Sequence, residues 1–260
     1  MRPRHAGRTR ASSGGEPLSR IHVGTSGWSY AHWHGVLYPH GASPRERLDY
    51  YLMRYRTVEL NSSYYRWPRR DSFARWRRRL PEEFTLSVKA PGLLTHVRQL
   101  YGPERWLARI GGDLARLGDR LGVLLVQLSP RLEYDYARLD YFLAHVPPGL
   151  RVAVEMRHPS WHREEVFDLL ARRGAAYCVM SGAHLPCVLR ATAPFVYVRL
   201  HGPDRQHLYA GSYPDVDLRW WADRVREWAG AGREVFAYFN NDGGGNAVRN
   251  ADTLKAMLGA

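Results

Sequence analysis

The stretch Arg151–Glu155, RVAVE, decides the fold because it is a short apolar run that ends on a carboxylate and precedes a helical pattern. Seven similar runs recur along the chain: Ile21–Gly24, Thr57–Leu60, Thr85–Val88, Gly122–Gln127, Ala176–Val179, Phe195–Leu200 and Glu234–Phe239. Strands that alternate with helices predict a parallel sheet. Eight such units in roughly 250 residues predict an α/β fold, a single closed (β/α)8 TIM barrel, whose functional groups lie where the strands end.

Length and composition predict one folded domain over residues 20–260, preceded by a tail over residues 1–19. The tail places arginines among Gly and Ser and has no apolar segment, so we expect it to be disordered and not a secretory signal. No apolar run approaches the ~18 residues of a membrane span, so we expect no membrane partner. Two cysteines are too few for a disulfide framework and favour a cytoplasmic setting.

The formal net charge of +13 favours acidic partners. Only Lys89 and Lys255 are lysines, and so strong a preference for arginine is also what a GC-rich coding bias produces. The remaining excess predicts a small anionic or phosphate-bearing substrate, with nucleic acid as the alternative polyanionic partner.

Polar residues alternate with apolar residues along four of the predicted strands. Glu59 and Asn61 oppose Val58 and Leu60, and the same division recurs in the runs that contain Lys89, Glu155 and Arg199. Because residues two apart share a face of a strand, the apolar face is expected to pack on the helices. The polar face is expected to form a pocket at the barrel mouth.

Glu59 and Glu155 both stand at strand ends. Two carboxylates at one barrel mouth can serve as acid and base when their environments separate their pKa values. The structural alternative is that each carboxylate pairs with a barrel arginine such as Arg157 or Arg199. Both interpretations stay open at the level of the sequence.

Lys89 ends the third run in a chain dominated by arginine. A desolvated lysine can lose its proton whereas an arginine cannot. Lys89 is therefore a candidate base, Schiff-base former or carbonyl polariser. An ordinary salt bridge to Glu59 is the alternative.

Three histidines, His96, His158 and His201, follow strand-like runs. They can act as metal ligands together with acidic residues, but no His-x-x-x-His or Cys/His spacing is present. We therefore predict no metal ligands and no required cofactor, and leave a divalent metal open.

The loop Asn240–Asn246, NNDGGGN, joins the last strand to the last helix. Its glycines, Gly243 and Gly244 among them, allow backbone N–H groups to converge on an anion beside a helix N-terminus. Arg157 and Arg199 would complete such an anion site, whereas a simple tight turn is the alternative. Aromatic residues crowd the first two loops and serve either to stack on a ligand or to cover the barrel: Trp28, Tyr30, Trp33, Tyr64, Tyr65 and Trp67.

Seven ordered motifs together resemble domain-of-unknown-function family 72, also called YecE-like. The motifs are VGTSGWSYAHWHGVLYP, TVELNSSYYRWP, SVKAPGLLTH, VQLSP, AVEMRHPSW, YVRLHG and YFNNDGGGNAVRNA. The resemblance runs from about Ile21 to Leu258 and implies a TIM barrel, but it implies no reaction. The tail before Arg20 and the triple glycine Gly243–Gly245 depart from the family pattern.

The leading hypothesis is a hydrolase or lyase that uses acid–base catalysis on a phosphate-bearing or nucleic-acid-like substrate. The alternatives are a carbohydrate-active enzyme with a two-carboxylate site and a non-catalytic binding adaptor. The candidate catalytic residues are Glu59, Lys89, Glu155 and His201. The candidate substrate-binding residues are Trp28, Asn61, Gln127, Arg157, His158, Arg199, Asn240, Asn241, Gly243 and Gly244.

Overall fold

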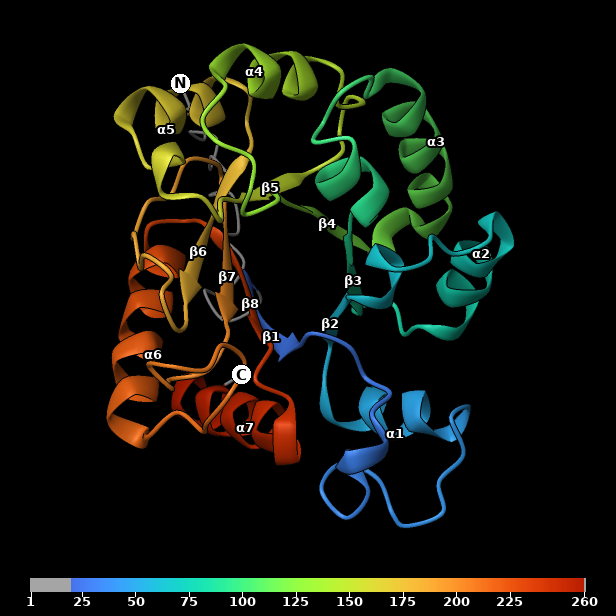
Figure 1. Cartoon of the computed structure of the whole chain (residues 1–260). Helices are drawn as coiled ribbons and strands as arrows, with labels where there is room; N and C mark the ends of the chain where they lie inside the picture. Colours follow the sequence, from blue (N-terminus) through green and yellow to red (C-terminus); the bar gives the residue numbers. More distant parts are fainter. Residues whose placement is uncertain (1–19, 260) are drawn as a thin grey trace, which may run out of the picture.

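The structure is a computed structural model that describes residues 20–259, so the predicted tail lies outside the described residues. The eight strands are β1 (Ile21–Thr25), β2 (Thr57–Leu60), β3 (Thr85–Lys89), β4 (Leu121–Gln127), β5 (Val152–Glu155), β6 (Ala176–Ser181), β7 (Phe195–Leu200) and β8 (Glu234–Phe239). The α-helices are α1 (Glu46–Arg54), α2 (Arg70–Arg79), α3 (Glu104–Leu114), α4 (Tyr136–Ala144), α5 (Glu164–Arg172), α6 (Asp215–Gly230) and α7 (Asn246–Leu258). The helices surround the strands (Figure 1).

All strand pairs are parallel, in the order β1-β8-β7-β6-β5-β4-β3-β2. Between β1 and β2 the pairing shrinks to one bridge, Ser26 with Glu59, where the Gly27 N–H donates to the Glu59 carbonyl at 2.8 Å. The strands therefore form a nearly closed barrel with a seam between β1 and β2, and the predicted TIM-barrel fold is confirmed.

Tyr51 of α1 joins the two strands of this seam. Its hydroxyl donates to the Thr57 carbonyl at 2.9 Å and accepts from the Thr25 N–H at 3.1 Å. Gly24 allows the close approach, because a Cβ there would lie 2.4 Å from the Thr57 carbonyl oxygen. A side-chain hydroxyl thus supplies part of the pairing that the backbone lacks here.

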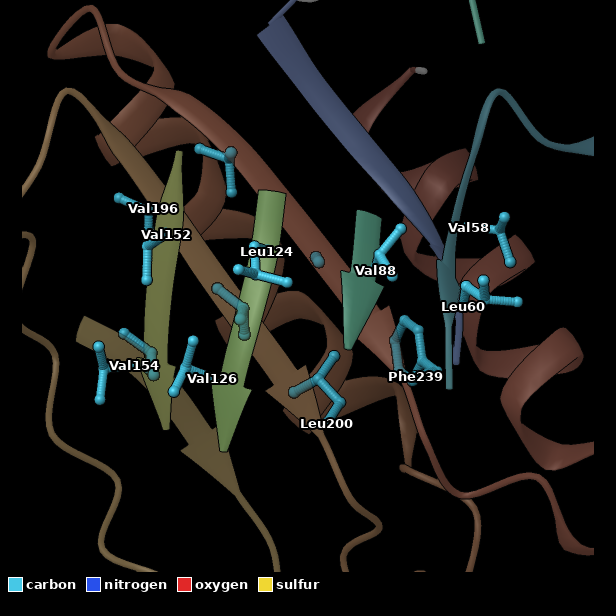
Figure 2. Close-up of a cluster of buried hydrophobic side chains, with 14 of the residues drawn as sticks. Val58, Leu60, Val88, Leu124, Val126, Val152, Val154, Val196, Leu200 and Phe239 are labelled. Atoms are coloured by element: carbon cyan, nitrogen blue, oxygen red, sulfur yellow. The ribbon is translucent and has the colours of Figure 1, made fainter. Parts of the chain in front are cut away.

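Apolar side chains on the outer face of the barrel pack against the helices. Figure 2 shows this layer along the strands, where Val58, Val88, Val126, Val154 and Leu200 are all buried. A second cluster fills the barrel interior and includes Val123, Leu125, Ala153, Cys178 and Phe236. The division into two faces follows the alternation in the sequence.

Local hydrogen bonds and glycine conformation set the helix boundaries. Ser43 and Pro44 precede α1, which begins at Glu46; the Ser43 N–H donates to the Glu46 carboxylate at 2.8 Å, and the Ser43 Oγ accepts from the Glu46 N–H at 3.4 Å. The amphipathic pattern of residues 105–121 extends beyond α3, which ends at Leu114 and continues as a 3₁₀ turn interrupted by Gly118 at φ 57°.

In the described part of the chain, the segment between β6 and β7 contains no helix. Within residues 20–259, no helix is both long and apolar enough to cross a membrane.

Candidate functional site

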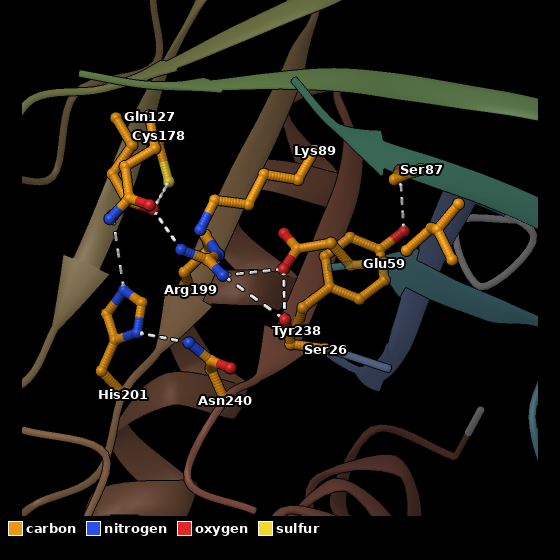
Figure 3. A network of polar contacts seen from close by, with 12 residues as sticks. Ser26, Glu59, Ser87, Lys89, Gln127, Cys178, Arg199, His201, Tyr238 and Asn240 are labelled. Atoms are coloured by element: carbon orange, nitrogen blue, oxygen red, sulfur yellow. Dashed lines mark hydrogen bonds and ion pairs between the residues drawn. The ribbon is translucent and has the colours of Figure 1, made fainter. Parts of the chain in front are cut away.

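Arg199 lies at the centre of a polar network at the carboxyl ends of the strands (Figure 3). Its guanidinium joins two carboxylates, with Nη2 2.8 Å from Oε1 of Glu59 and Nη1 2.6 Å from Oε2 of Glu155. All three side chains are fully buried. The shared strand face therefore brings together the residues that the sequence predicted, and the arginine neutralises part of their charge.

Glu59 accepts two further hydrogen bonds besides the one from Arg199. The Ser26 hydroxyl donates to Oε1 at 2.5 Å, and the Tyr197 hydroxyl donates to Oε2 at 2.7 Å. Burial, together with the Glu59 charge, raises the pKa of Tyr197 well above its usual range, so this phenol stays a donor. Both oxygens of Glu59 are thus occupied by internal donors.

Glu155 is held in the same manner. Gln127 Nε2 donates to its Oε1 at 2.9 Å, and Arg157 Nε also donates to Oε1. Burial alone would raise the pKa of Glu155, but the Arg157 and Arg199 guanidinium groups outweigh burial and hold it well below its usual range. The two guanidinium groups therefore favour the ionised form of Glu155.

His201 continues the network from the end of β7. Its Nε2 lies 3.3 Å from Arg157 Nη2, and the Asn240 amide lies 3.1 Å from its Nδ1. Burial, reinforced by the neighbouring Arg199 charge, lowers the pKa of His201 well below its usual range. The imidazole is therefore neutral and serves as a hydrogen-bonding link.

A cavity of about 450 Å³ opens beside this network. It is lined by Gly27, Trp28, Ser29, Tyr30, Leu60, Asn61, Ser62, Tyr65, Lys89, Tyr209, Asn240 and Asp242. Its volume suits a small ligand, and its lining joins aromatic walls to a few polar groups. Glu59 and Glu155 are not among the lining residues, because they face Arg199.

Lys89 is the cationic side chain in the lining. Its Nζ lies 4.4 Å from the centre of the Tyr64 ring and makes no hydrogen bond or ion pair with any described residue. Burial, with the Arg199 charge, lowers the pKa of Lys89 to about 8. The salt bridge to Glu59 considered from the sequence does not form, because Glu59 is paired with Arg199.

Polar groups flank Lys89 around the cavity. Oδ1 of Asn61 is buried and accepts no hydrogen bond from the described residues. Asn240 reaches the same cavity from β8, and Asp242 follows with its carboxylate 3.4 Å from His32. The cavity thus offers an ammonium, an unused acceptor and an amide to a ligand.

The other predicted binding residues lie elsewhere. Gln127 and Arg157 hold Glu155, and the ring of His158 accepts from the Ser160 N–H at 3.3 Å. Asn241 is buried and donates to the Gly211 carbonyl and to Asn250 Oδ1, each at 2.9 Å. It therefore ties β8 to α7 and to the loop after β7.

The glycine loop lies apart from the cavity and from the two arginines that the sequence placed beside it. Gly243 and Gly244 are exposed and do not line the cavity, while Arg157 and Arg199 point to carboxylates. Gly244 and Gly245 adopt positive φ, and a Cβ on Gly245 would lie 2.9 Å from Val36. The loop geometry is thus that of a tight turn packed on the loop after β1.

Sequence reasoning missed Ser26, Tyr197 and Tyr209. Tyr197 could have been found, because it shares a strand face with Arg199 two residues away. Tyr209 follows β7 in an irregular loop that offers no periodic signal. Among residues 20–259, no group of three or more His, Cys, Asp or Glu side chains is placed to hold a metal ion.

Several known proteins resemble this chain over nearly its whole length. The UPF0759 protein YunF of Bacillus subtilis is 25% identical over 269 residues, covering 92% of this chain and 94% of the relative. A crystal structure of a DUF72 family protein from Thermotoga maritima is 30% identical, covers 92% of this chain and 99% of its own, and superposes with a TM-score of 0.82. A DUF72 family protein from Enterococcus faecalis shares the fold, with a TM-score of 0.80 at 21% identity over 92% of this chain and 96% of its own.

The family model described as "Protein of unknown function DUF72" matches residues 22–260. This match covers nearly the whole chain and agrees with the motifs that run from β1 to α7. The chain therefore belongs to the DUF72 family.

Proposed function

We propose that the protein is an acid–base enzyme, a hydrolase or lyase, that acts on a small phosphate-bearing substrate in the Lys89 cavity. One observation carries the proposal: the Lys89 side chain lines the cavity, and its ammonium forms no ion pair or hydrogen bond with any residue in the described part of the chain. A buried cation with no partner is costly, and an anionic ligand would supply the missing partner.

Lys89 also has the proton affinity that the reaction needs. With a pKa of about 8, it is mostly protonated at neutral pH yet can release its proton. General acids work best when their pKa lies near the working pH. In the proposed hydrolysis Lys89 contacts the phosphate, water attacks the phosphorus and the P–O bond to the leaving group breaks. Lys89 donates a proton to the departing oxygen, and the proton released by the attacking water returns the amine to its ammonium form.

The surrounding residues orient the substrate and fix the site. Asn61 and Asn240 line the same cavity as Lys89 and offer amide groups to the substrate. The network of Glu59, Arg199 and Glu155 positions the strand ends below the cavity. The carboxylates of this network oppose the effect of the Arg199 and Arg157 charges on Lys89.

The carbohydrate alternative needs two carboxyl groups that face the substrate. Here both carboxylates are turned to Arg199, and their oxygens are occupied by internal donors. The adaptor alternative expects carboxylates with ordinary pKa values, whereas that of Glu155 is strongly lowered. The geometry therefore favours the lysine-centred reaction.

A substrate screen tests the proposal. The full chain is incubated with a library of phosphorylated metabolites and short oligonucleotides, and consumption is followed by mass spectrometry. We expect a small phosphate ester to be consumed by the parent protein and by Lys255→Met, but not by Lys89→Met. Lys255 is a matched control because it lies on α7, where it donates to the Arg54 carbonyl at 2.6 Å. Equal turnover by Lys89→Met would refute the proposal.

A further inference from the structure

Two tyrosines at the mouth of the Lys89 cavity present their rings to solvent. Tyr65, after β2, is 83% exposed, and Tyr209, after β7, is 41% exposed, yet both line the cavity. The other two aromatic residues in the lining, Trp28 and Tyr30, are only partly exposed, and the Tyr30 hydroxyl donates to the Ser26 carbonyl at 2.6 Å. Tyr65 and Tyr209 therefore have ring surface available to a ligand.

The backbone of Tyr209 is held in an unfavourable conformation. Its φ is +71°, in the left-handed region that bulky residues rarely adopt. Its N–H donates to the His201 carbonyl at 2.7 Å, and its loop is pinned where Gly202 lies close to Ala210. Glycine would occupy this position without strain, so the tyrosine ring is held here at a cost in backbone free energy.

The strained backbone places the Tyr209 ring at the wall of the cavity. The ring stacks edge-on against His201 with 5.3 Å between centres, in the same lining as Lys89 and Asn61. Planar ligands stack on aromatic side chains, and this stacking tolerates many ring types. The unpartnered Oδ1 of Asn61 can accept a hydrogen bond from a ring N–H or amino group.

We infer that Tyr209 and Tyr65 form a stacking subsite for the planar ring of an anionic ligand whose charged group faces Lys89. The ligand class is a phosphate ester that carries a heteroaromatic ring, such as a nucleoside monophosphate. The inference depends on the proposed function only for the anionic group of the ligand. The ring subsite itself is inferred from the position and the backbone conformation of Tyr209.

Calorimetric titration of the full chain tests the subsite with four probes: adenosine monophosphate, adenosine, ribose 5-phosphate and inorganic phosphate. We expect adenosine monophosphate to bind at least ~10-fold more tightly than ribose 5-phosphate, as one stacked ring provides. Tyr209→Gly should reduce this preference to about 3-fold or less, raise the melting temperature and leave phosphate affinity unchanged. Tyr209→Phe should keep the preference, because the ring remains.

His184→Gly is the matched control, because His184 also has a positive φ of 58° but does not line this cavity. It should raise the melting temperature without changing any affinity. Equal affinity for adenosine monophosphate and ribose 5-phosphate, or an unchanged preference in Tyr209→Gly, would overturn the subsite. If the parent protein does not bind inorganic phosphate, the Lys89 proposal is refuted instead. Adenosine binding that depends on Tyr209 would in that case still support the ring subsite.

Discussion

Glu59 of β2 and Arg199 of β7 form a fully buried ion pair inside the barrel, with Oε1 and Nη2 2.8 Å apart. The same guanidinium reaches Glu155 of β5. One arginine thus joins strands that are distant in the sheet order, and its loss would leave two buried carboxylates without their shared partner.

Arg199→Met should therefore lower the free energy of unfolding by about 3–5 kcal/mol, because removal of one partner leaves buried charge uncompensated. Denaturant unfolding followed by circular dichroism measures the change. Arg173→Met is the control: it breaks an exposed pair with Asp140 and should cost less than about 1 kcal/mol. Similar losses in the two variants would contradict a central role for Arg199.

Tyr51→Phe should open the seam between β1 and β2. The change removes the hydroxyl that accepts from the Thr25 N–H and donates to the Thr57 carbonyl. We expect a loss of about 1–3 kcal/mol and faster hydrogen exchange in β1 and β2. Tyr136→Phe, which removes a surface hydroxyl whose one partner among the described residues is Arg172, should change neither. Unaltered exchange in Tyr51→Phe would show that the backbone alone closes the barrel.

The strand positions and the polar face could be predicted from the sequence because both depend on a period of two. The ion-pair partner of each charged side chain could not be predicted, because the alternation places Glu59, Lys89 and Arg199 on one face without deciding which of them form contacts. The sequence left open a Lys89–Glu59 salt bridge, whereas the branched guanidinium of Arg199 holds both carboxylates and leaves Lys89 to the cavity.

Loop conformation escaped prediction for a different reason. The position of Tyr209 depends on contacts between Gly202 and Ala210 and on a hydrogen bond from Asn241 to Gly211, all set by the folded structure. The early end of α3 likewise follows from the left-handed Gly118, which an amphipathic pattern does not reveal.

His201 should make stability depend on pH below neutrality. Its pKa is lowered in the folded protein, so the unfolded chain binds a proton near pH 6.5 that the folded protein does not. Stability should therefore fall as the pH drops below about 6.5, by up to about 1.4 kcal/mol per pH unit. His201→Gln should show a shallower decline between pH 7 and 5 in denaturant titrations. The exposed His207→Gln should keep the parent slope, and an identical slope in His201→Gln would refute the assignment.

Lys89→Met should stabilise the protein at neutral pH. The pKa of Lys89 falls from 10.5 to about 8 on folding, so below pH 8 the fold carries the full cost of a buried ammonium. That cost, up to about 3 kcal/mol, is relieved as the pH rises from 8 to 10.5. The melting temperature of Lys89→Met should exceed that of the parent at pH 7 and approach it near pH 10. Lys255→Met should give a smaller gain, because burial also lowers the pKa of Lys255 but its ammonium donates to the Arg54 carbonyl. A destabilised Lys89→Met at pH 7 would contradict the unpaired ammonium.

The proton affinity of the Lys89 amine tests the central claim most directly. The chain has two lysines, so trace acetylation over a range of pH, quantified by mass spectrometry, compares Lys89 with Lys255 in one sample. The account predicts an apparent pKa near 8 for Lys89 and slower acetylation of Lys89, but not of Lys255, when inorganic phosphate is added. An apparent pKa near 10.5 at Lys89, with no protection by phosphate, would contradict it.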